Sequence, residues 1–437
     1  MKAPLHTLTL RAAANAIRAG EFTSETYTRA LLERIAASDA NVQAWAHLDP
    51  DAAIAAARQA DAELDAGLRS GALAGIGIGV KDIVATASAP TQMGSPIYAG
   101  AQPDFDAECV LRLQRAGAFV LGKTVTTEFA FLQPGKTRNP WRAAHTPGGS
   151  SSGSAAAVAL GQVPGALGTQ TNGSVIRPAA FCGVVGFKPT RDAIPFSGVN
   201  VFSQTLDALG VFTRDVADCA LLTSCLADSP RIASELARVD SAPRLALLPA
   251  FPWVAIGAEQ ERALQAASDA LRSAGATLTE VALPDAWHEA HLVQRAIMLH
   301  EGVQQLAALQ LRERQRMSDK LNAALDEGRE IGAEVYSAAL ARRAAFIAEA
   351  TAWLAPFDAI LTPPAPGPAP ADLTQTGDPA CCTLWSLLGF PALSIPSAFA
   401  DSGLPLGLQL ATIAGGDAHL LAVARWCEQH LPFEGLA

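Results

Sequence analysis

Two short segments concentrate residue types that could form a reactive site. In the first, residues 146–160, the sequence TPGGSSSGSAAAVAL places two glycines and three serines directly before an alanine-rich stretch. Gly148 and Gly149 allow a tight turn, and we expect a serine to cap a helix that starts near Ser154. The free N–H groups and the positive end of such a helix would favour negative charge. A flexible glycine-serine linker is the alternative interpretation.

The second segment, GTQTNGSVIRPAAFCGVVGFKP, contains Ser174, which follows Ser150 by 24 positions. Asn172 and Gly173 tolerate left-handed backbone conformations, so the turn before Ser174 could aim several consecutive N–H groups to one side. Donors arranged in this way form an oxyanion hole. Because Ser and Asn are also ordinary turn residues, this segment indicates catalysis only if a base lies nearby.

The base that the sequence offers is a lysine. Among the eight histidines only His288 and His291 form a pattern, H-x-x-H, and we expect that pair to serve packing rather than metal binding. Lys81 ends the apolar run GIGIGV on an expected buried strand. Desolvation lowers the pKa of a lysine, and a neutral amine is a competent general base near pH 7. A strand-end lysine whose amine reaches solvent is the alternative.

A different serine fits a known nucleophile motif. Residues 149–153 match G-x-S-x-G, which would make Ser151 the nucleophile on a strand-to-helix elbow of the α/β-hydrolase type. The residues before it, NPWRAAHTPG, include two prolines and are not typical of a core strand. The local pattern therefore argues against an elbow.

Charge patterning indicates that both segments are buried. Residues 143–176 are 34 consecutive residues without Asp, Glu, Lys or Arg, yet they are rich in hydroxyl and amide side chains. Buried polar groups must be satisfied internally, and a concentration of them is typical of a site.

The surrounding pattern predicts one large α/β domain over residues 1–437, with a helical cover at about 1–70 and a core from about 71 onward. Helical patterns occupy residues 8–66, 108–117 and a long region at 258–354. Apolar runs typical of strands occupy residues 75–85, 118–124, 244–250, 358–366 and 391–399. A proline-rich loop is expected at residues 362–373. Helices and strands alternate, as in a sheet covered by helices.

Composition narrows the class of protein. The 437 residues are 50% apolar, and the formal net charge is -10, so no basic stripe is available for nucleic acid or an anionic membrane. Seven cysteines, an odd number without a C-x-x-C pair, are typical of reduced thiols. No signal-peptide core or membrane-spanning run is visible, so we expect a cytoplasmic protein.

Seven blocks of sequence, in order, resemble the amidase signature family. They are GIGVKDI around Lys81, GKTVTTEFA at 122–130, GKTRNPW at 135–141, TPGGSSSGSAAAVA at 146–159, GTQTNGSVIRPAAFCGVVGFKPT at 168–190, LDALGVFTRDVADCALL at 206–222, and LLGFPALSIPSAFADSGLPLGLQLA at 387–411. The resemblance implies a single α/β/α domain with a mixed central sheet flanked by helices. It also implies a catalytic triad of Ser174 as nucleophile, Ser150 as bridging serine after a cis peptide bond, and Lys81 as base.

The resemblance further implies how the other residues of the site would act. Backbone N–H groups of Thr171, Asn172, Gly173 and Ser174 would hold the oxyanion, and Thr169 would support the triad with its hydroxyl. No cofactor and no metal ion are expected. The expected partner is a small-molecule amide, and the expected assembly is a homodimer.

Two positions depart from the family pattern. The common Thr-Asp-x-Gly-Gly-Ser is here Thr169-Gln170-Thr171-Asn172-Gly173-Ser174, so a carboxylate is lost and a glycine becomes Asn172. Asn172 tolerates the left-handed geometry, but its side chain would restrict the acyl site. Arg177 follows the nucleophile by three positions instead of two, a spacing that resembles the malonamidase branch, in which this arginine binds a substrate carboxylate.

The expected function is thus hydrolysis of a small, carboxylated amide through an acyl-enzyme on Ser174. In that case Arg177 and Asn172 would contact the substrate; an arginine that fixes its loop through backbone carbonyls is the alternative for Arg177. Three other functions stay open: a glutaminase-type A subunit of an amidotransferase complex, a catalytically inactive binding module of the same fold, and an esterase.

Overall fold

The computed structural model describes residues 4–68, 71–237 and 241–436. Its centre is an 11-stranded sheet with the strand order β1-β3-β2-β4-β6-β5-β10-β11-β9-β7-β8. The strands are β1 (Trp45–His47), β2 (Gly77–Lys81), β3 (Phe119–Thr124), β4 (Gly165–Gln170), β5 (Val185–Lys188), β6 (Ala208–Thr213), β7 (Arg244–Leu247), β8 (Thr277–Glu280), β9 (Ala359–Thr362), β10 (Ala392–Phe399) and β11 (Pro405–Ala411).

The sheet is mixed. Strand β2 pairs in parallel with β3 and β4, and β7 pairs in parallel with β8 and β9, whereas the central strands β4, β6, β5, β10, β11 and β9 pair antiparallel in turn. Because β2 and β4 are adjacent and parallel, their carboxyl ends meet at one edge of the sheet. The antiparallel neighbour β6 begins at that same edge, where Gln170 pairs with Ala208.

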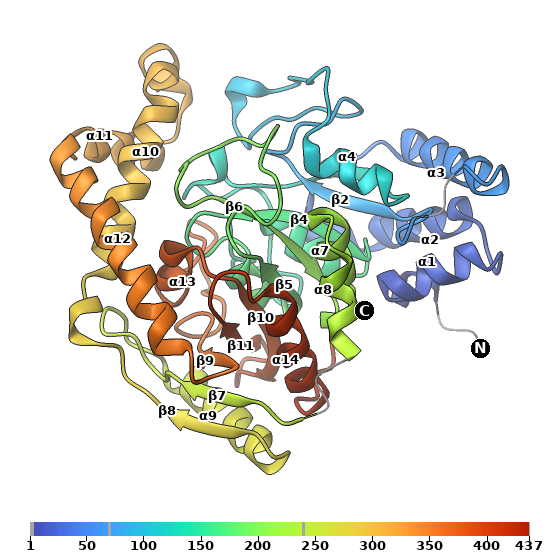
Figure 1. Cartoon of the computed structure of the whole chain (residues 1–437). Coiled ribbons are helices and arrows are strands. Elements are labelled where there is room, and N and C mark those ends of the chain that lie inside the picture. Colours follow the sequence, from blue (N-terminus) through green and yellow to red (C-terminus); the bar gives the residue numbers. More distant parts are fainter. Residues whose placement is uncertain (1–3, 69–70, 238–240, 437) are drawn as a thin grey trace.

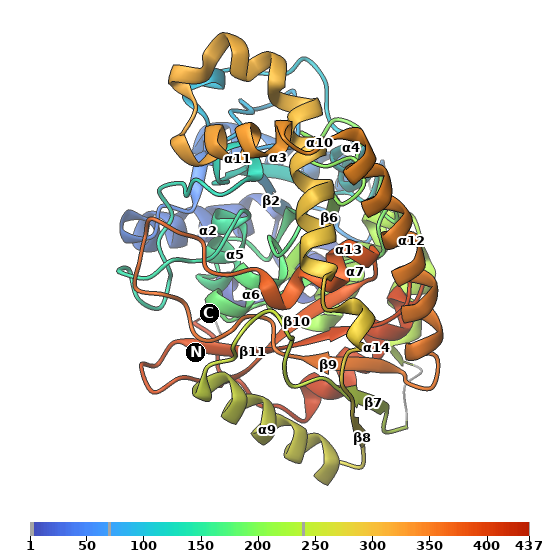
Figure 2. The same cartoon turned by 90° about the vertical axis from the view of Figure 1, so that its left-hand side faces the viewer.

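Helices cover both faces of the sheet. The α-helices are α1 (Leu10–Arg18), α2 (Ser24–Ser38), α3 (Pro50–Asp65), α4 (Glu108–Arg115), α5 (Ser152–Ala159), α6 (Ile176–Cys182), α7 (Val216–Ala227), α8 (Pro230–Ser234), α9 (Ala258–Ser273), α10 (Ala290–Glu313), α11 (Asp319–Arg329), α12 (Ala333–Leu354), α13 (Thr383–Leu388) and α14 (Asp417–Gln429). Figure 2 shows α5 and α6 on one side of the sheet and α7 and α14 on the other.

Close approach of α5 to the sheet depends on a glycine in β4. A Cβ atom on Gly168 would lie 2.7 Å from the Ser151 hydroxyl and 2.6 Å from the Phe212 ring. No side chain fits there without displacing one of them, so glycine lets the start of α5 lie directly against β4. The site loops that flank α5 are thereby fixed to the sheet.

Helices α10, α11 and α12 form a separate wall beside the sheet (Figure 1). Helices α10 and α12 pack over a second apolar cluster that includes Trp287, Phe346 and Trp385, all nearly fully buried. A third cluster joins α10 and α11 to Phe129, Phe131 and Phe202 from the loops above the sheet. The wall therefore faces the same loops that carry the site.

All five strands expected from the sequence are present, but six of the eleven strands were not predicted, namely β1, β4, β5, β6, β8 and β11. The expected strands at 75–85, 118–124, 244–250, 358–366 and 391–399 contain β2, β3, β7, β9 and β10. Helix α2 is capped by Thr23, whose side chain accepts from Thr26 N–H. Strand β1 interrupts the helical pattern of 8–66, and β8 interrupts that of 258–354. Residues 1–3 and 69–70 of the expected N-terminal cover lie outside the described residues.

Two further observations bear on the sequence analysis. All seven cysteines are free thiols in the structure. Among the described residues, no helix is long and apolar enough to cross a membrane.

Candidate active site

The amine of Lys81 lies at the carboxyl edge of β2, fully buried. Its Nζ hydrogen-bonds Ser150 Oγ at 2.7 Å and Thr169 Oγ1 at 2.8 Å. Thr169 comes from the parallel strand β4, so the meeting of the two strand ends explains this contact. Burial lowers the pKa of Lys81 from 10.5 to about 7, and the nearby carboxylate of Asp207 opposes that shift. A neutral amine is therefore well populated near pH 7.

The loop before α5 is packed and hydrogen-bonded, unlike a flexible linker. The peptide bond between Gly149 and Ser150 is cis, as the family resemblance implied. Gly148 has a φ of 82°, and a Cβ atom there would lie 2.7 Å from Pro178. Ser150 is 2% exposed. The linker interpretation is therefore wrong.

Ser151 does not act in either of the ways that its position suggested. It occupies the N-cap position of α5, which starts at Ser152 rather than near Ser154, but its side chain does not cap the helix. Its hydroxyl instead hydrogen-bonds the backbone N–H and carbonyl of Thr169, both at 3.2 Å. It is fully buried, and residues 141–150 form turns rather than a strand, so the elbow motif is absent.

Ser174 lies in the turn between β4 and α6 and lines a cavity of about 380 Å³. Its hydroxyl forms no hydrogen bond within the described part of the chain. The turn is joined to the Ser150 loop, because Ser151 N–H donates to the Ser174 carbonyl at 3.4 Å. The structure thus brings the loops of Ser174 and Ser150 together beside the end of β2, where Lys81 lies.

The backbone N–H groups of this turn are free to bind an oxyanion. Over residues 4–68, 71–237 and 241–436, no acceptor contacts the N–H groups of Asn172, Gly173 or Ser174. Gln170, which replaces the family's aspartate, accepts from Val175 N–H at 2.8 Å and Ile176 N–H at 3.0 Å. One amide oxygen therefore satisfies the first N–H groups of α6 and leaves those of the turn available.

Asp207 was not among the predicted site residues, although it stands in the block LDALGV that resembles the family. It lies directly before β6, and its carboxylate accepts from Thr171 Oγ1 at 2.6 Å and from the N–H groups of Phe202 and Ser203 at 2.7 and 3.1 Å. Burial raises the pKa of Asp207 to about 6, against the effect of these donors. A lone aspartate before an apolar strand was the only signal of this role in the sequence.

Arg177 fixes backbone rather than presenting a two-donor edge to a ligand. Its Nε donates to the Thr376 carbonyl at 2.7 Å, and its Nη2 donates to the Gly149 carbonyl at 2.8 Å and to Thr376 Oγ1 at 3.1 Å. Only Nη1 has no partner among the described residues, and it is buried. A bidentate pair with a substrate carboxylate needs two free donor groups, so this arrangement favours the loop-fixing alternative.

Asn172 points its carboxamide along the cavity wall. Its Oδ1 accepts from Thr383 Oγ1 at 2.9 Å, its backbone carbonyl accepts from Ser386 Oγ, and its Nδ2 lies 3.5 Å from Gln294 Oε1. The side chain thus contributes to the cavity, as expected, and its partners on α10 and α13 were not anticipated.

The cavity wall is mostly apolar away from Ser174. Its apolar side chains come from the loop after β3, from the loop before β6, from the segment after β7 and from α10: Phe131, Leu132, Phe202, Trp253 and Met298. His291 also lines it, but the ring stacks on Trp253 with 5.4 Å between centroids, and His288 pairs weakly with Asp285 at 3.7 Å. Within the described residues no group of three or more His, Cys, Asp or Glu side chains could hold a metal ion.

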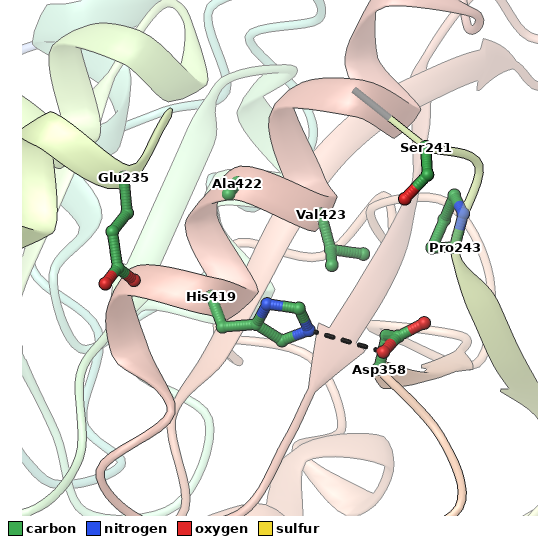
Figure 3. A pocket seen from close by; sticks show the side chains of 7 residues that line it. All are labelled: Glu235, Ser241, Pro243, Asp358, His419, Ala422 and Val423. Carbon is green, nitrogen blue, oxygen red and sulfur yellow. Dashed lines mark ion pairs between the residues drawn. The ribbon is translucent and has the colours of Figure 1, made fainter. Parts of the chain in front are cut away.

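A second cavity, of about 260 Å³, lies beside α14 (Figure 3). Its charged side chains pair with each other or with a surface arginine: His419 Nε2 lies 3.5 Å from Asp358 Oδ1, and Arg244 also pairs with Asp358. No residue of the Lys81, Ser150 and Ser174 group lines it. Of these three residues, Ser174 lines the 380 Å³ cavity instead.

Comparison with known proteins agrees with this fold. An A subunit of a glutamyl-tRNA(Gln) amidotransferase from Chloroflexus aggregans is 35% identical over 96% of this chain and 95% of that protein. A crystal structure of an amidase matches with a TM-score of 0.87 and 30% identity, over 97% of this chain and 100% of that one. The peptide amidase from Stenotrophomonas maltophilia matches with a TM-score of 0.82 and 30% identity, over 98% of both chains.

A mixed 11-stranded sheet between helical layers, with these relatives, defines an α/β enzyme that cleaves amide carbon–nitrogen bonds. The chain belongs to the amidase family, whose model matches residues 26–421. The resemblance to amidase signature proteins is thereby confirmed. Since these relatives are an amidotransferase subunit and amidases, they give no support to the malonamidase branch in particular.

Proposed function

We propose that this protein hydrolyses a small amide through an acyl-enzyme on Ser174, with Ser150 as bridging serine and Lys81 as base. One observation supports it above all: a fully buried amine contacts Ser150 at 2.7 Å beside a cavity that Ser174 lines. A lysine that cannot reach solvent is costly to bury, and activation of a hydroxyl explains its place.

The acylation step follows from this arrangement. Neutral Lys81 takes a proton from Ser150, Ser150 takes one from Ser174, and the Ser174 oxygen attacks the amide carbonyl. The tetrahedral oxyanion accepts hydrogen bonds from backbone N–H groups of residues 171–174. Collapse breaks the carbon–nitrogen bond, and the proton held by Lys81 returns through Ser150 to the leaving amine. Water then attacks the acyl ester by the same route and releases the acid.

Thr169 and Asp207 hold this group in position. Thr169 gives the Lys81 amine a second hydrogen-bond partner, which directs the amine toward Ser150. Asp207 fixes Thr171, the first residue of the oxyanion turn, and its charge stabilises the protonated form of Lys81. Both residues act by positioning the groups that react.

The decisive experiment combines labelling and turnover. A fluorophosphonate probe should label Ser174, as mapped by mass spectrometry, and a panel of primary amides should release ammonia with the wild type but not with Ser174→Ala. Labelling of Ser151 instead would contradict the assignment. Absence of both labelling and turnover would support the inactive binding module, and faster cleavage of matched esters would support the esterase.

A second candidate rests on the relatives. Since an amidotransferase A subunit is 35% identical over nearly the whole chain, a glutaminase role within a complex is the alternative. In that case glutamine should be hydrolysed efficiently only with a partner subunit that copurifies from the native host. Efficient hydrolysis of other amides by the isolated chain would rule this alternative out.

The contacts of Arg177 argue against the expected preference for carboxylated amides. That preference required Arg177 to bind a carboxylate, but its guanidinium already donates three hydrogen bonds to the protein. The remaining Nη1 group offers at most a single-atom contact. We therefore propose a neutral small amide as the substrate class.

A further inference from the structure

Two carboxamides, Asn172 and Gln294, lie side by side on the cavity wall. Asn172 belongs to the oxyanion turn, two positions before Ser174, and Gln294 lies on α10. Asn172 Oδ1 is fixed by Thr383, which leaves its Nδ2 directed toward Gln294 Oε1 at 3.5 Å. This distance is at the outer limit of a hydrogen bond.

Gln294 is poorly satisfied by the protein. The residue is 2% exposed, and the only acceptor for its Nε2 among the described residues is the Met298 thioether at 3.5 Å. A thioether is a weak acceptor, and a buried amide without proper partners costs free energy. Buried polar groups are normally well paired, so a carboxamide on a cavity wall whose two side-chain contacts are both 3.5 Å long indicates a ligand that completes its hydrogen bonds.

The charges around the cavity favour a neutral ligand group. Arg295 is paired with Glu327, with Nε 2.8 Å from Oε1, and Arg177 is held by carbonyl groups. Asp378 also lines the cavity, and its carboxylate is exposed and makes no ion pair within the described residues. An anionic substrate would meet this carboxylate, whereas a neutral amide would not.

We propose that Asn172 and Gln294 form a subsite that binds a second, neutral carboxamide or ureido group of the substrate. Asn172 Nδ2 and Gln294 Nε2 donate to its carbonyl oxygen, and Gln294 Oε1 accepts from its N–H. Asn172 and Ser174 are two positions apart, and two residues of chain span at most roughly 7 Å, so we expect the second group to lie only a few atoms from the scissile carbonyl. The substrates are therefore small diamides or acylureas. This inference rests on the proposed function of Ser174.

The test compares three substrates of matched shape by ammonia release. Succinamide carries the second carboxamide, 4-methylpentanamide replaces it with an isopropyl group, and succinamate replaces it with a carboxylate. The wild type should prefer succinamide over each of the other two by roughly tenfold or more in kcat/KM. Gln294→Met keeps the length of the side chain but not its hydrogen bonds, so it should reduce the preference over 4-methylpentanamide by roughly five- to tenfold.

Two controls make the result specific. Gln265→Met changes an exposed glutamine on α9 whose side chain donates a hydrogen bond to Asp269, and it should leave the preference unchanged. If Gln294→Met does not fold, Asn172→Ala provides the same comparison from the other half of the subsite. In every variant the rate of fluorophosphonate labelling at Ser174 reports the triad independently of the second group.

The outcomes separate this inference from the proposed function. An unchanged preference in Gln294→Met with normal labelling would show a merely structural contact and overturn the subsite. A wild type that prefers succinamate or 4-methylpentanamide would also overturn it, although Ser174 chemistry would stand. Failure of both labelling and ammonia release would instead refute the proposed function.

Discussion

The carboxylate of Asp207 accepts a 2.6 Å hydrogen bond from the Thr171 hydroxyl, while its charge acts on the amine of Lys81. One buried acid thus fixes the oxyanion turn and influences the proposed base. The pairing of β4 with β6 explains this position, because the end of the first strand lies beside the start of the second. The charges of Asp207 and Lys81 should therefore affect the activity and the stability of the protein in measurable ways.

Activity should depend on the protonation of Lys81. Because only the neutral amine accepts the Ser150 proton, kcat/KM should rise with pH through about 7 and then level off. Lys81→Ala should lower amide turnover by roughly 10²- to 10⁴-fold and abolish this rise. Ammonia release between pH 5 and pH 9 measures both; near-normal turnover in Lys81→Ala would exclude the lysine as base.

The burial of Lys81 should also make the unfolding free energy of the protein depend on pH. The folded-state pKa of Lys81, about 7, lies below its ordinary value of 10.5, so between these values the unfolded chain binds more protons than the folded one. The wild type should therefore gain unfolding free energy relative to Lys81→Met as pH rises from 7 to 10, by roughly 1.4 kcal/mol per pH unit. Urea unfolding of both proteins at several pH values tests this; a constant difference would contradict it.

Asp207→Asn should shift the pH profile in a defined direction. The carboxylate stabilises the protonated form of Lys81, so its loss should lower the pKa of that amine further. The acidic limb of kcat/KM should move to lower pH, in addition to any loss from loosening of Thr171. If the acidic limb of the Asp207→Asn variant lies at the same pH as that of the wild type, or at a higher pH, the charge of Asp207 does not act on Lys81.

Arg177→Met should reduce activity toward succinamide and succinamate to a similar extent. The guanidinium binds the Gly149 and Thr376 carbonyls, so its loss loosens the Ser150 loop regardless of the substrate. We expect roughly tenfold or greater losses in kcat/KM for both compounds. Arg142→Met removes an exposed arginine that donates to the Ser402 carbonyl and should have little effect. A loss confined to succinamate would restore the carboxylate-binding role.

The sequence predicted five of the eleven strands and the proposed reactive group, because those features have local signals. Lys81 ends an apolar run, and the two glycine-containing segments stand out by their lack of charge. Strand β8 was missed because TLTE is only four residues long and lies between two long helical patterns. The side-chain direction of Arg177 was not predictable either, since it depends on the Thr376 loop 199 positions away.

Gln294 could not be found from local sequence at all. It is one of several glutamines on a long helix, and only the packing of α10 against the oxyanion turn distinguishes it. Asn172 carried a weak signal through its departure from the family pattern, but its partners Thr383 and Gln294 are more than 100 positions away. Such contacts between distant segments belong to tertiary structure alone.

Helix α10 also anchors the loop that leads to Asp207. Two turns beyond Gln294, its Glu301 is buried and accepts from Thr205 N–H at 2.9 Å, from the hydroxyls of Ser203 and Thr205, and from Tyr336 Oη at 2.7 Å. Substrate choice and the alignment of the reacting groups therefore share one rigid support. An engineer who redesigns this enzyme for new amides can exchange side chains near Gln294, but grafting a whole α10 from a relative would also replace the anchor of the catalytic loop.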